Sequence, residues 1–286
     1  MAFSDLQMKV TAEAALQGIH ASLVKLQDFA HTYSELNDRK VASIVVPVFD
    51  LSAAADFNAT SNNYGSGANE IDAATLTLNK HLVKSVSITD KNLAETEIQW
   101  TKDAGIGIGN IIGRGLNEYV FGRIAAEADN TVSATFDGTS KATLANLYKA
   151  AADNDLDVED SVIVLAPEQF AKVLGNLPAN EYGSADAIKN GRIPGLFGFA
   201  SVVCSTKLGT GKKGYIINRN AVGIASRYLE PMAGAYPAIW KAVDPDNGFT
   251  VGFREFADLK SGVRYLAGEA LVGAKVIFPK KIVTLA

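Results

Sequence analysis

Residues 94–127 read AETEIQWTKDAGIGIGNIIGRGLNEYVFGRIAAE, and the fold that we expect is built around this stretch. It contains no proline, and its apolar residues recur at helical spacing in the order Ile108, Ile112, Leu116, Val120 and Ile124. A helix over the whole stretch would be about 50 Å long, far longer than an average helix. The pattern therefore predicts one long helix that spans the molecule.

Glycines interrupt this helical pattern at six positions: Gly105, Gly107, Gly109, Gly113, Gly115 and Gly122. Each glycine costs a helix about 1 kcal/mol relative to alanine, so tertiary contacts must offset the loss. Gly105, Gly109 and Gly113 recur every four residues and share one face, where another backbone can approach closely. We expect a packing spine on this face, and residues 105–109 are where we would expect any break in the helix.

Two glycine-rich stretches are candidates for the GxGxxG motif of dinucleotide-binding proteins. Gly107 and Gly109 are followed by Ile112 where the GxGxxG motif needs glycine, and no strand-turn-helix unit frames them. Residues 209–214, GTGKKG, match the motif literally, but a predicted strand follows them instead of a helix. We interpret 209–214 as a hairpin turn, and keep a small-molecule enzyme with a ligand at this turn as the weakest hypothesis.

Composition bounds the class of protein. The chain has 286 residues, 48% of them hydrophobic and 20% charged, which is enough for one large domain or two smaller ones. The net charge of -4 shows no overall basic surface for nucleic acid. Cys204 is the single cysteine, so an intrachain disulfide is excluded, and we expect it on a buried strand. Without a secretory signal or an 18-residue apolar run, we expect a cytoplasmic protein with no membrane partner.

Candidate catalytic and metal-binding residues form no convincing group. The three histidines are too far apart in sequence for a helical metal pair: His20, His31 and His81. Asp153, Asp155 and Asp157 imitate the start of a calcium loop, but Val158 and Val164 replace its glycine and closing glutamate. We therefore predict no catalytic residue, no cofactor and no metal site.

The N-terminal third of the chain predicts two segments that reach outward. Residues 11–36 carry apolar residues at helical spacing, which predicts one amphipathic helix. Either the same chain or a neighbouring subunit must cover its apolar face. Residues 41–49 and 71–81 resemble strands around a long stretch rich in Ala, Ser, Asn and Gly, which is unusual inside a compact domain. We expect inter-subunit contacts from both segments, through Leu16, Ile19, Leu23, Leu26, Phe49, Phe57, Tyr64 and Ile71.

Helices and strands in the rest of the chain do not alternate regularly, which predicts an α+β fold with a mixed sheet. Helices are expected over residues 143–152, from Pro167 to about Gly175, and over 184–190. The expected strands cover 161–166, 199–205, 215–218, 221–227, 249–256, 263–278 and 282–285.

Four of these stretches resemble a known family in both their order and their spacing. They are SVIVLAPEQFAKVLGN (161–176), KNGRIPGLFGFASVVCSTKL (189–208), GYIINRNAVGIASRYLEP (214–231) and YLAGEALVGAKVIFPKKIVTL (265–285). Together they are similar to the major capsid proteins of tailed bacteriophages with the Hong Kong 97-like fold. Each motif is loose when taken alone, and the resemblance rests on the whole series.

The resemblance implies an architecture. It assigns residues 1–40 to an N-terminal arm, 41–80 to an extended loop, 81–139 and 240–286 to a peripheral domain, and 140–239 to an axial domain. It also implies hexamers and pentamers of the chain in an icosahedral shell around double-stranded DNA. The DNA contacts would be nonspecific because the chain is acidic.

The same resemblance implies partners and a place of assembly. These are a portal, in some relatives a decoration protein, and a scaffold. Only about 40 residues precede the loop, so either the scaffolding protein is separate or the sequence is that of the mature chain, and Met1 favours a separate protein. The shell would assemble in the host cytoplasm and become the capsid of the virion. The runner-up within the fold is an encapsulin, a shell that encloses protein cargo.

Overall fold

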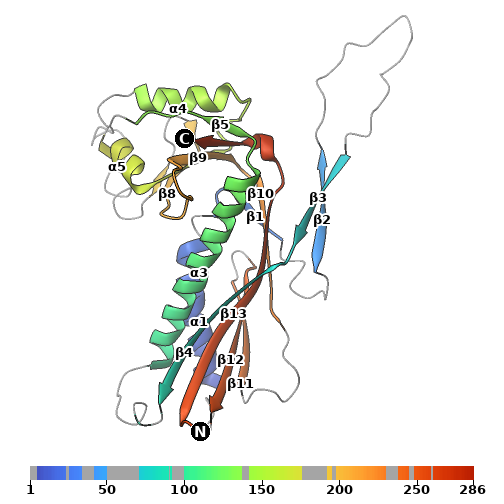
Figure 1. The fold of residues 1–286 in the computed structure, drawn as a ribbon, viewed down its shortest axis with the longest axis vertical. Coiled ribbons are helices and arrows are strands. Elements are labelled where there is room, and N and C mark those ends of the chain that lie inside the picture. The colour runs from blue at the N-terminus through green and yellow to red at the C-terminus, as the bar shows by residue number, and fades with distance from the viewer. Residues whose placement is uncertain are drawn as a thin grey trace, which may run out of the picture.

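The computed structural model describes residues 5–23, 26–33, 42–49, 71–89, 91, 100–136, 142–175, 192–194, 198–229, 238–244, 248–258 and 260–286. It has an elongated body with two sheets, a helix along its length and a hairpin at its side (Figure 1). The α+β class and the mixed sheets that we predicted are confirmed, because parallel and antiparallel strand pairs occur in both large sheets.

The long helix is α3 (Trp100–Glu127), which has 28 residues and runs along the body of the molecule (Figure 1). The predicted long helix is confirmed over these residues, whereas 92–99 lie outside the described part of the chain. The helix is continuous through residues 105–109, so no break occurs where the glycines first cluster. A second helix lies against this segment and stabilises it.

That second helix is α1 (Asp5–Leu23), and its backbone touches the backbone of α3. A Cβ atom added at Gly105 would overlap the carbonyl oxygen of Thr11, and one at Gly109 would overlap that of Ala15. In the reverse direction, a Cβ added at Gly18 would lie 2.9 Å from the backbone nitrogen of Asn110. The two helices therefore lie so close that only glycine fits at these positions.

The prediction of one helix over residues 11–36 was wrong at its C-terminal end. α1 ends at Leu23, and β1 (Ala30–Thr32) pairs in parallel with β10, Ala30 opposite Val222. The apolar spacing continues past Leu23 because Leu26 and Phe29 are buried in the same core as the helix. Strand pairing with a segment almost 200 residues away overrides the local helical pattern.

The larger sheet, which we call the β13 sheet, is organised around its longest strand. β4 pairs along one edge of β13, while β12 and then β10 pair along the other edge. Alternate residues of β13, from Leu266 to Val276, face α3 and α1 and form the main core with them. Its six strands are β1, described above, and β4 (Lys80–Thr89), β10 (Val222–Arg227), β11 (Ala238–Val243), β12 (Thr250–Asp258) and β13 (Val263–Val276).

The smaller sheet, which we call the β6 sheet, is buried on both faces. Val162, Val164 and Ile217 face α3, whereas Ile163, Leu165 and Ile216 belong to a second core that includes residues of α4 and α5. In order across the sheet, its strands are β5 (Asn130–Val132), β14 (Ile282–Leu285), β9 (Gly214–Asn218), β6 (Ser161–Leu165), β8 (Ser201–Cys204) and β7 (Arg192–Pro194). The covering helices are α4 (Ala142–Ala152) and α5 (Pro167–Gly175), as predicted.

The two sheets do not follow the predicted segment boundaries. β10 lies within residues 140–239 but pairs in the β13 sheet, and β14 lies within 240–286 but pairs in the β6 sheet. The short helix η3 (Pro279–Lys281) connects β13 to β14, so the last strands of the chain cross from one sheet to the other. The predicted helix over 184–190 lies outside the described residues.

The loop at residues 209–214 is not the hairpin turn that we predicted. Its flanking strands β8 and β9 do not pair with each other, because β6 lies between them and pairs with both. Gly209 and Gly211 have φ values of 88° and 75°, which favour glycine, so the glycines serve the path of this crossover. Cys204 lies half-buried at the end of β8.

An aromatic contact joins α3 to the β6 sheet. The ring of Phe121 stacks on that of Tyr215 with 6.3 Å between centroids, and the Tyr215 hydroxyl donates a hydrogen bond to the Leu208 carbonyl at 2.9 Å. Burial raises the pKa of Tyr215 to about 12, so this side chain is neutral near pH 7. α3 therefore packs against both sheets.

The contact between α1 and α3 predicts opposite effects for two alanine substitutions in one helix. Gly109→Ala places a methyl group on the Ala15 carbonyl and should lower the free energy of unfolding by about 1–3 kcal/mol. A Cβ atom added at Gly122 would have no neighbouring atom within 4 Å. Gly122→Ala should therefore raise the free energy of unfolding by up to about 1 kcal/mol. Urea unfolding of the two variants measures both changes, and equal effects would contradict close helix packing.

Candidate functional site

A two-stranded hairpin stands apart from the two large sheets and is the first part of the candidate site. β2 (Ser43–Phe49) pairs antiparallel with β3 (Ile71–Thr77), and the pair lies beside the body with its own edges (Figure 1). Pro47 lies within β2, as expected of a strand with a free edge. Val45 is 63% exposed and Leu76 is 1% exposed, so the hairpin has an outer and an inner side.

The base of the hairpin is held firmly on the β13 sheet. Leu76 and Leu78 form a small core with Ala225 of β10, and Leu271 of β13 packs against it. A Cβ atom added at Gly273 would overlap the carbonyl oxygen of Thr77, so strand β13 and the hairpin are in backbone contact. These contacts fix the direction in which the hairpin leaves the body.

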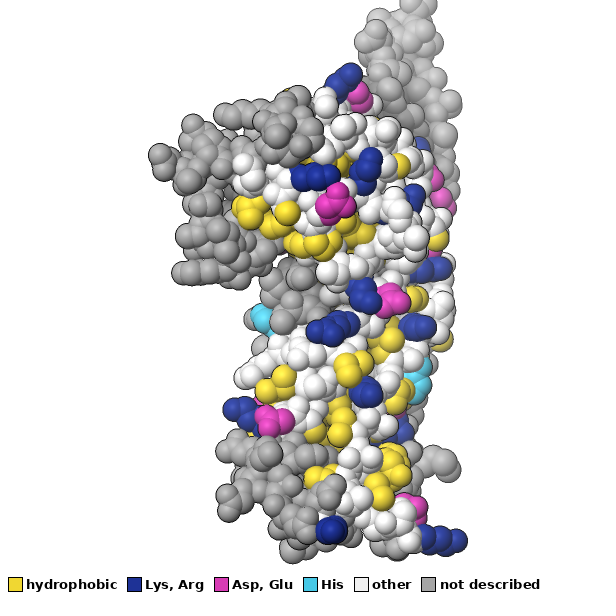
Figure 2. Space-filling model, turned by 60° about the vertical axis from the view of Figure 1, so that its left-hand side comes forward, with side chains coloured by type: hydrophobic (Ala, Val, Ile, Leu, Met, Phe, Trp, Pro, Cys, Tyr) yellow, Lys and Arg dark blue, Asp and Glu magenta, His cyan; other side chains and the backbone are white. Residues whose placement is uncertain are grey.

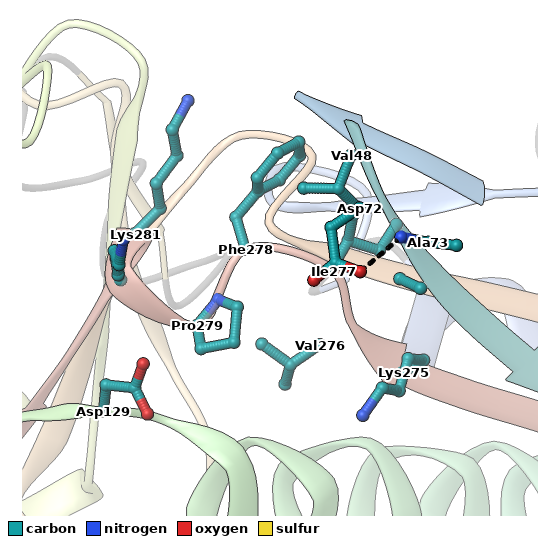
Figure 3. Close-up of a pocket in the computed structure, with 12 residues that line it drawn as sticks. Val48, Asp72, Ala73, Asp129, Lys275, Val276, Ile277, Phe278, Pro279 and Lys281 are labelled. Atoms are coloured by element: carbon teal, nitrogen blue, oxygen red, sulfur yellow. Dashed lines mark hydrogen bonds between the residues drawn. The ribbon is translucent and has the colours of Figure 1, made fainter. Parts of the chain in front are cut away.

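A hollow of about 400 Å³ lies between the hairpin and the connection from β13 to β14 (Figure 3). Residues 276–279 form one apolar wall, and Val48, Ala73 and Ala74 of the hairpin form another. Charged side chains surround these walls: Asp72, Asp129, Lys275, Lys280 and Lys281. The hollow therefore combines an apolar interior with a charged rim.

Three of the charged side chains at the rim have partners that can be named. Lys275 donates to the Glu127 carboxylate at 2.9 Å, and the Lys281 ammonium lies 5.0 Å from the centre of the Phe278 ring. Asp72 accepts a hydrogen bond from the backbone nitrogen of Ala73 at 2.7 Å, as Figure 3 shows. Lys280 and Lys281 are both exposed, so two cations border the apolar wall at Phe278 and Pro279.

A second, shallower hollow lies between β4 and the outer face of α3. It is lined by Lys80, Leu82, Gly115, Glu118, Tyr119, Gly122 and Arg123. The Tyr119 hydroxyl donates to the Asn79 side chain at 2.6 Å, and Glu118 pairs with Lys207 at 3.1 Å. Ile111 and Val83 are among the exposed large apolar side chains of the described residues. On the face drawn in Figure 2, apolar side chains lie in small groups among charged ones.

The residues predicted for inter-subunit contact fall into three groups. Ile19 and Leu26 are buried in the core of their own chain and Leu16 packs against it, so the expectation that they face a neighbour was wrong. α1 covers its apolar face within the chain because the glycines of α3 let it approach. Leu23, Phe49 and Ile71 lie in described helices or strands, but the structure does not describe their side chains. Phe57 and Tyr64 lie outside the described residues.

The residues predicted for spine packing lie on the face of α3 that meets α1. Gly105 and Gly109 contact α1 as described above, and Gly113 is buried. Sequence reasoning missed the complementary residues of α1, although Thr11, Ala15 and Gly18 are small and three or four positions apart. It also missed the hollow, whose walls come from segments more than 200 residues apart and leave no local signal.

Two features are absent from the part of the chain that the structure describes: a cluster of metal ligands and a membrane-spanning helix. Within those ranges, no three His, Cys, Asp or Glu side chains are grouped so as to hold a metal ion. No described helix is long and apolar enough to cross a bilayer.

Comparisons by sequence found neither a matching family model nor a matching curated protein. Comparison with solved structures found many matches at low identity. The capsid of cyanophage P-SCSP1u is 17% identical, with a TM-score of 0.58 and coverage of 90% of this chain and 85% of that one. The capsid of a native GTA particle is 12% identical, with a TM-score of 0.60 and coverage of 93% and 89%.

A third match is a virus-like particle from Pyrococcus furiosus, which is 12% identical with a TM-score of 0.59 and covers 99% of this chain and 100% of that one. These likenesses cover nearly the whole chain, and they include the helices and both sheets. The chain has a Hong Kong 97-like capsid fold, as the sequence motifs led us to expect.

The anchoring of the hairpin predicts unequal effects for two substitutions on neighbouring rungs of its ladder. Leu76→Ala removes a side chain that is 1% exposed and should lower the free energy of unfolding by about 2–5 kcal/mol. Val45→Ala, at a side chain that is 63% exposed, should change it by less than about 0.5 kcal/mol. Thermal and urea unfolding measure both changes. An unchanged free energy of unfolding in Leu76→Ala would mean that the hairpin is not anchored at this residue.

Proposed function

We propose that this chain is the major capsid protein of a tailed bacteriophage, a structural protein that assembles with copies of itself into a closed shell and carries out no catalysis. The observation that supports this most strongly is the likeness over at least 90% of the chain to solved capsids and particles. The hairpin at the side of the body supports it too, since a lateral projection suits contact with a neighbouring copy.

The finer features of this proposal follow from the sequence resemblance. The copies form hexamers and pentamers of an icosahedral shell that encloses double-stranded DNA, and the chain is part of the virion. Contacts to DNA are nonspecific, in keeping with a net charge of -4. A separate scaffolding protein, a portal and a decoration protein are its further partners, and assembly takes place in the host cytoplasm.

A second candidate function is a shell that encloses protein cargo instead of DNA. The sequence resemblance keeps this shell as the runner-up, and the chain also matches a virus-like particle from Pyrococcus furiosus over 99% of this chain and 100% of that one. An enzyme with a ligand at residues 209–214 is the weakest alternative, because the loop leads into β9 and not into a helix that could receive a phosphate.

Assembly of the purified chain tests the proposal. Expressed alone or together with a scaffolding protein, the chain should form closed, uniform particles in negative-stain electron microscopy. Particles isolated from infected or producing cells should contain nuclease-protected double-stranded DNA, whereas protected protein cargo would favour the second candidate. A compact monomer of 30.2 kDa under all of these conditions would contradict both shell functions.

The composition of residues 41–79 predicts that the shell is not joined by isopeptide bonds in which this segment supplies the lysine. Such a bond needs a lysine amine brought against a side-chain amide or carboxyl group of a neighbour, and residues 41–79 contain no lysine. Lys80 and Lys84 lie on β4, beyond the hairpin. Particles boiled in detergent and reductant should therefore give one band near 30.2 kDa, and a ladder of multimers would contradict this prediction.

A further inference from the structure

We infer that the outer side of α3, together with the adjoining edge of β4, is a surface that binds the phosphate backbone of double-stranded DNA. We call this surface the basic face and define it by Lys80, Lys84, Arg114, Arg123 and Lys207. The inference rests on the proposed shell function and assigns to it the side of the subunit that meets the enclosed DNA. It is carried by the placement of charge on a chain that is acidic as a whole.

Two lysines of β4 lie beside the outer side of α3. In the ladder between β4 and β13, Lys84 is opposite Gly268 and Lys80 is opposite Val272. Gly268 lies on the side of the sheet that α3 covers, because a Cβ atom added there would overlap the side chain of Ile108. Residues opposite each other in a ladder share one side of the sheet, so both lysines project on the side of α3.

The outer side of α3 adds two arginines and an open floor. Arg114 is exposed, and Arg123 lines the shallow hollow between β4 and α3 together with Lys80. Gly115 and Gly122 line the same hollow, so no side chain rises from the helix at these two positions. The cations therefore stand around a depression in which a phosphate group can come close to the helix backbone.

Two cations of the basic face are paired with carboxylates. Lys207, in the loop that follows β8, donates to Glu118 at 3.1 Å, and Arg123 donates to Glu127 at 3.0 Å. Glu127 also accepts from Lys275 at 2.9 Å, so two cations share this one carboxylate. Even among the paired groups, positive charge exceeds negative charge.

The other three cations of the basic face, Lys80, Lys84 and Arg114, pair with no carboxylate among the described residues. Nearer the start of α3, Lys102 and Asp103 are adjacent and exposed, so their charges offset each other. The face therefore keeps an excess of positive charge. Such an excess creates a local positive potential, which attracts polyanions even to a chain with a net charge of -4.

The negative charge of the chain gathers elsewhere. Residues 153–160, DNDLDVED, connect α4 to β6 and carry five carboxylates, all of them exposed. On the face drawn in Figure 2, in contrast, Lys and Arg side chains recur along the body with fewer Asp and Glu side chains between them. The net charge of the chain therefore conceals a separation of charge between two parts of its surface.

The spread of these cations favours an extended polyanion over a single phosphate group. The helix rises about 14 Å from Arg114 to Arg123, and Lys80 and Lys84 are about 13 Å apart along their strand. Duplex DNA carries one charge per about 1.7 Å of its axis, so several phosphates lie within such a length. Contacts to phosphates carry no sequence information, which agrees with nonspecific binding.

A duplex suits the basic face better than an acidic protein does. Protein interfaces have an apolar centre surrounded by a polar rim. Among the described residues of α3, Ile111 is the one exposed large apolar side chain, so the outer side of the helix lacks such a centre. Its cations and its glycine floor match a partner that is recognised by charge alone.

Binding of a labelled duplex to the purified chain tests the inference. The probe is a fluorescein-labelled duplex of about 30 base pairs, followed by anisotropy near pH 7 in about 50 mM salt. Lys84→Glu with Arg114→Glu should lower the association constant at least about tenfold, because two attractive contacts become repulsive. The matched control, Lys149→Glu with Lys260→Glu, changes the net charge equally at exposed lysines outside the face and should lower it less than about twofold.

Salt dependence gives a second readout, which a folding defect would not produce. For Lys84→Gln with Arg114→Gln, the plot of log association constant against log salt concentration should be less steep by about two, one for each lost phosphate contact. Urea unfolding of the same variant should match that of the wild type. A stable variant that keeps the wild-type slope would overturn the inference.

The remaining outcomes separate this inference from the proposed function. A wild-type chain that forms closed particles but binds no duplex in low salt would overturn the inference and leave the shell function in place. A chain that binds the duplex through the basic face and never assembles would contradict the shell function alone. Stronger binding of poly-L-glutamate than of the duplex, weakened by Lys84→Glu with Arg114→Glu, would assign the face to an acidic protein and overturn the inference.

Discussion

The rest of the structure depends on the direct contact between the backbones of α1 and α3. Gly105 and Gly109 of α3 meet the carbonyl oxygens of Thr11 and Ala15, and Gly18 of α1 meets Asn110 in return. Dispersion contacts along such a close helix pair offset the intrinsic cost of glycine in a helix. As a result, a glycine-rich segment that would melt alone forms a continuous helix of 28 residues.

A helix of this length allows two sheets to share one support. Its apolar face packs against the β13 sheet along most of its length, and Phe121 reaches Tyr215 of the β6 sheet. The chain also crosses between the sheets at residues 277–281, where β13 ends and η3 leads into β14. These two connections fix the body as one elongated unit, and the hairpin is anchored to it by Leu76 and Leu78.

The same arrangement fixes the shape of the hollow beside the hairpin. The hollow is formed where the hairpin, the end of β13 and η3 meet, so its shape depends on the firm placement of all three. The charges around it are local, and the acidic balance of the whole chain does not reveal them.

The sequence by itself determined the elements whose patterns are local. The apolar spacing from Ile108 to Ile124 predicted the long helix, which the structure confirms as α3. Pro167 marked the start of α5, and apolar runs marked β6, β9 and β13. Its ordered motifs also pointed to the capsid fold. Only the tertiary structure decided that α1 ends at Leu23, that β6 separates β8 from β9, and that α1 is covered within its own chain. Each of these depends on pairing between distant segments, for which local spacing holds no information.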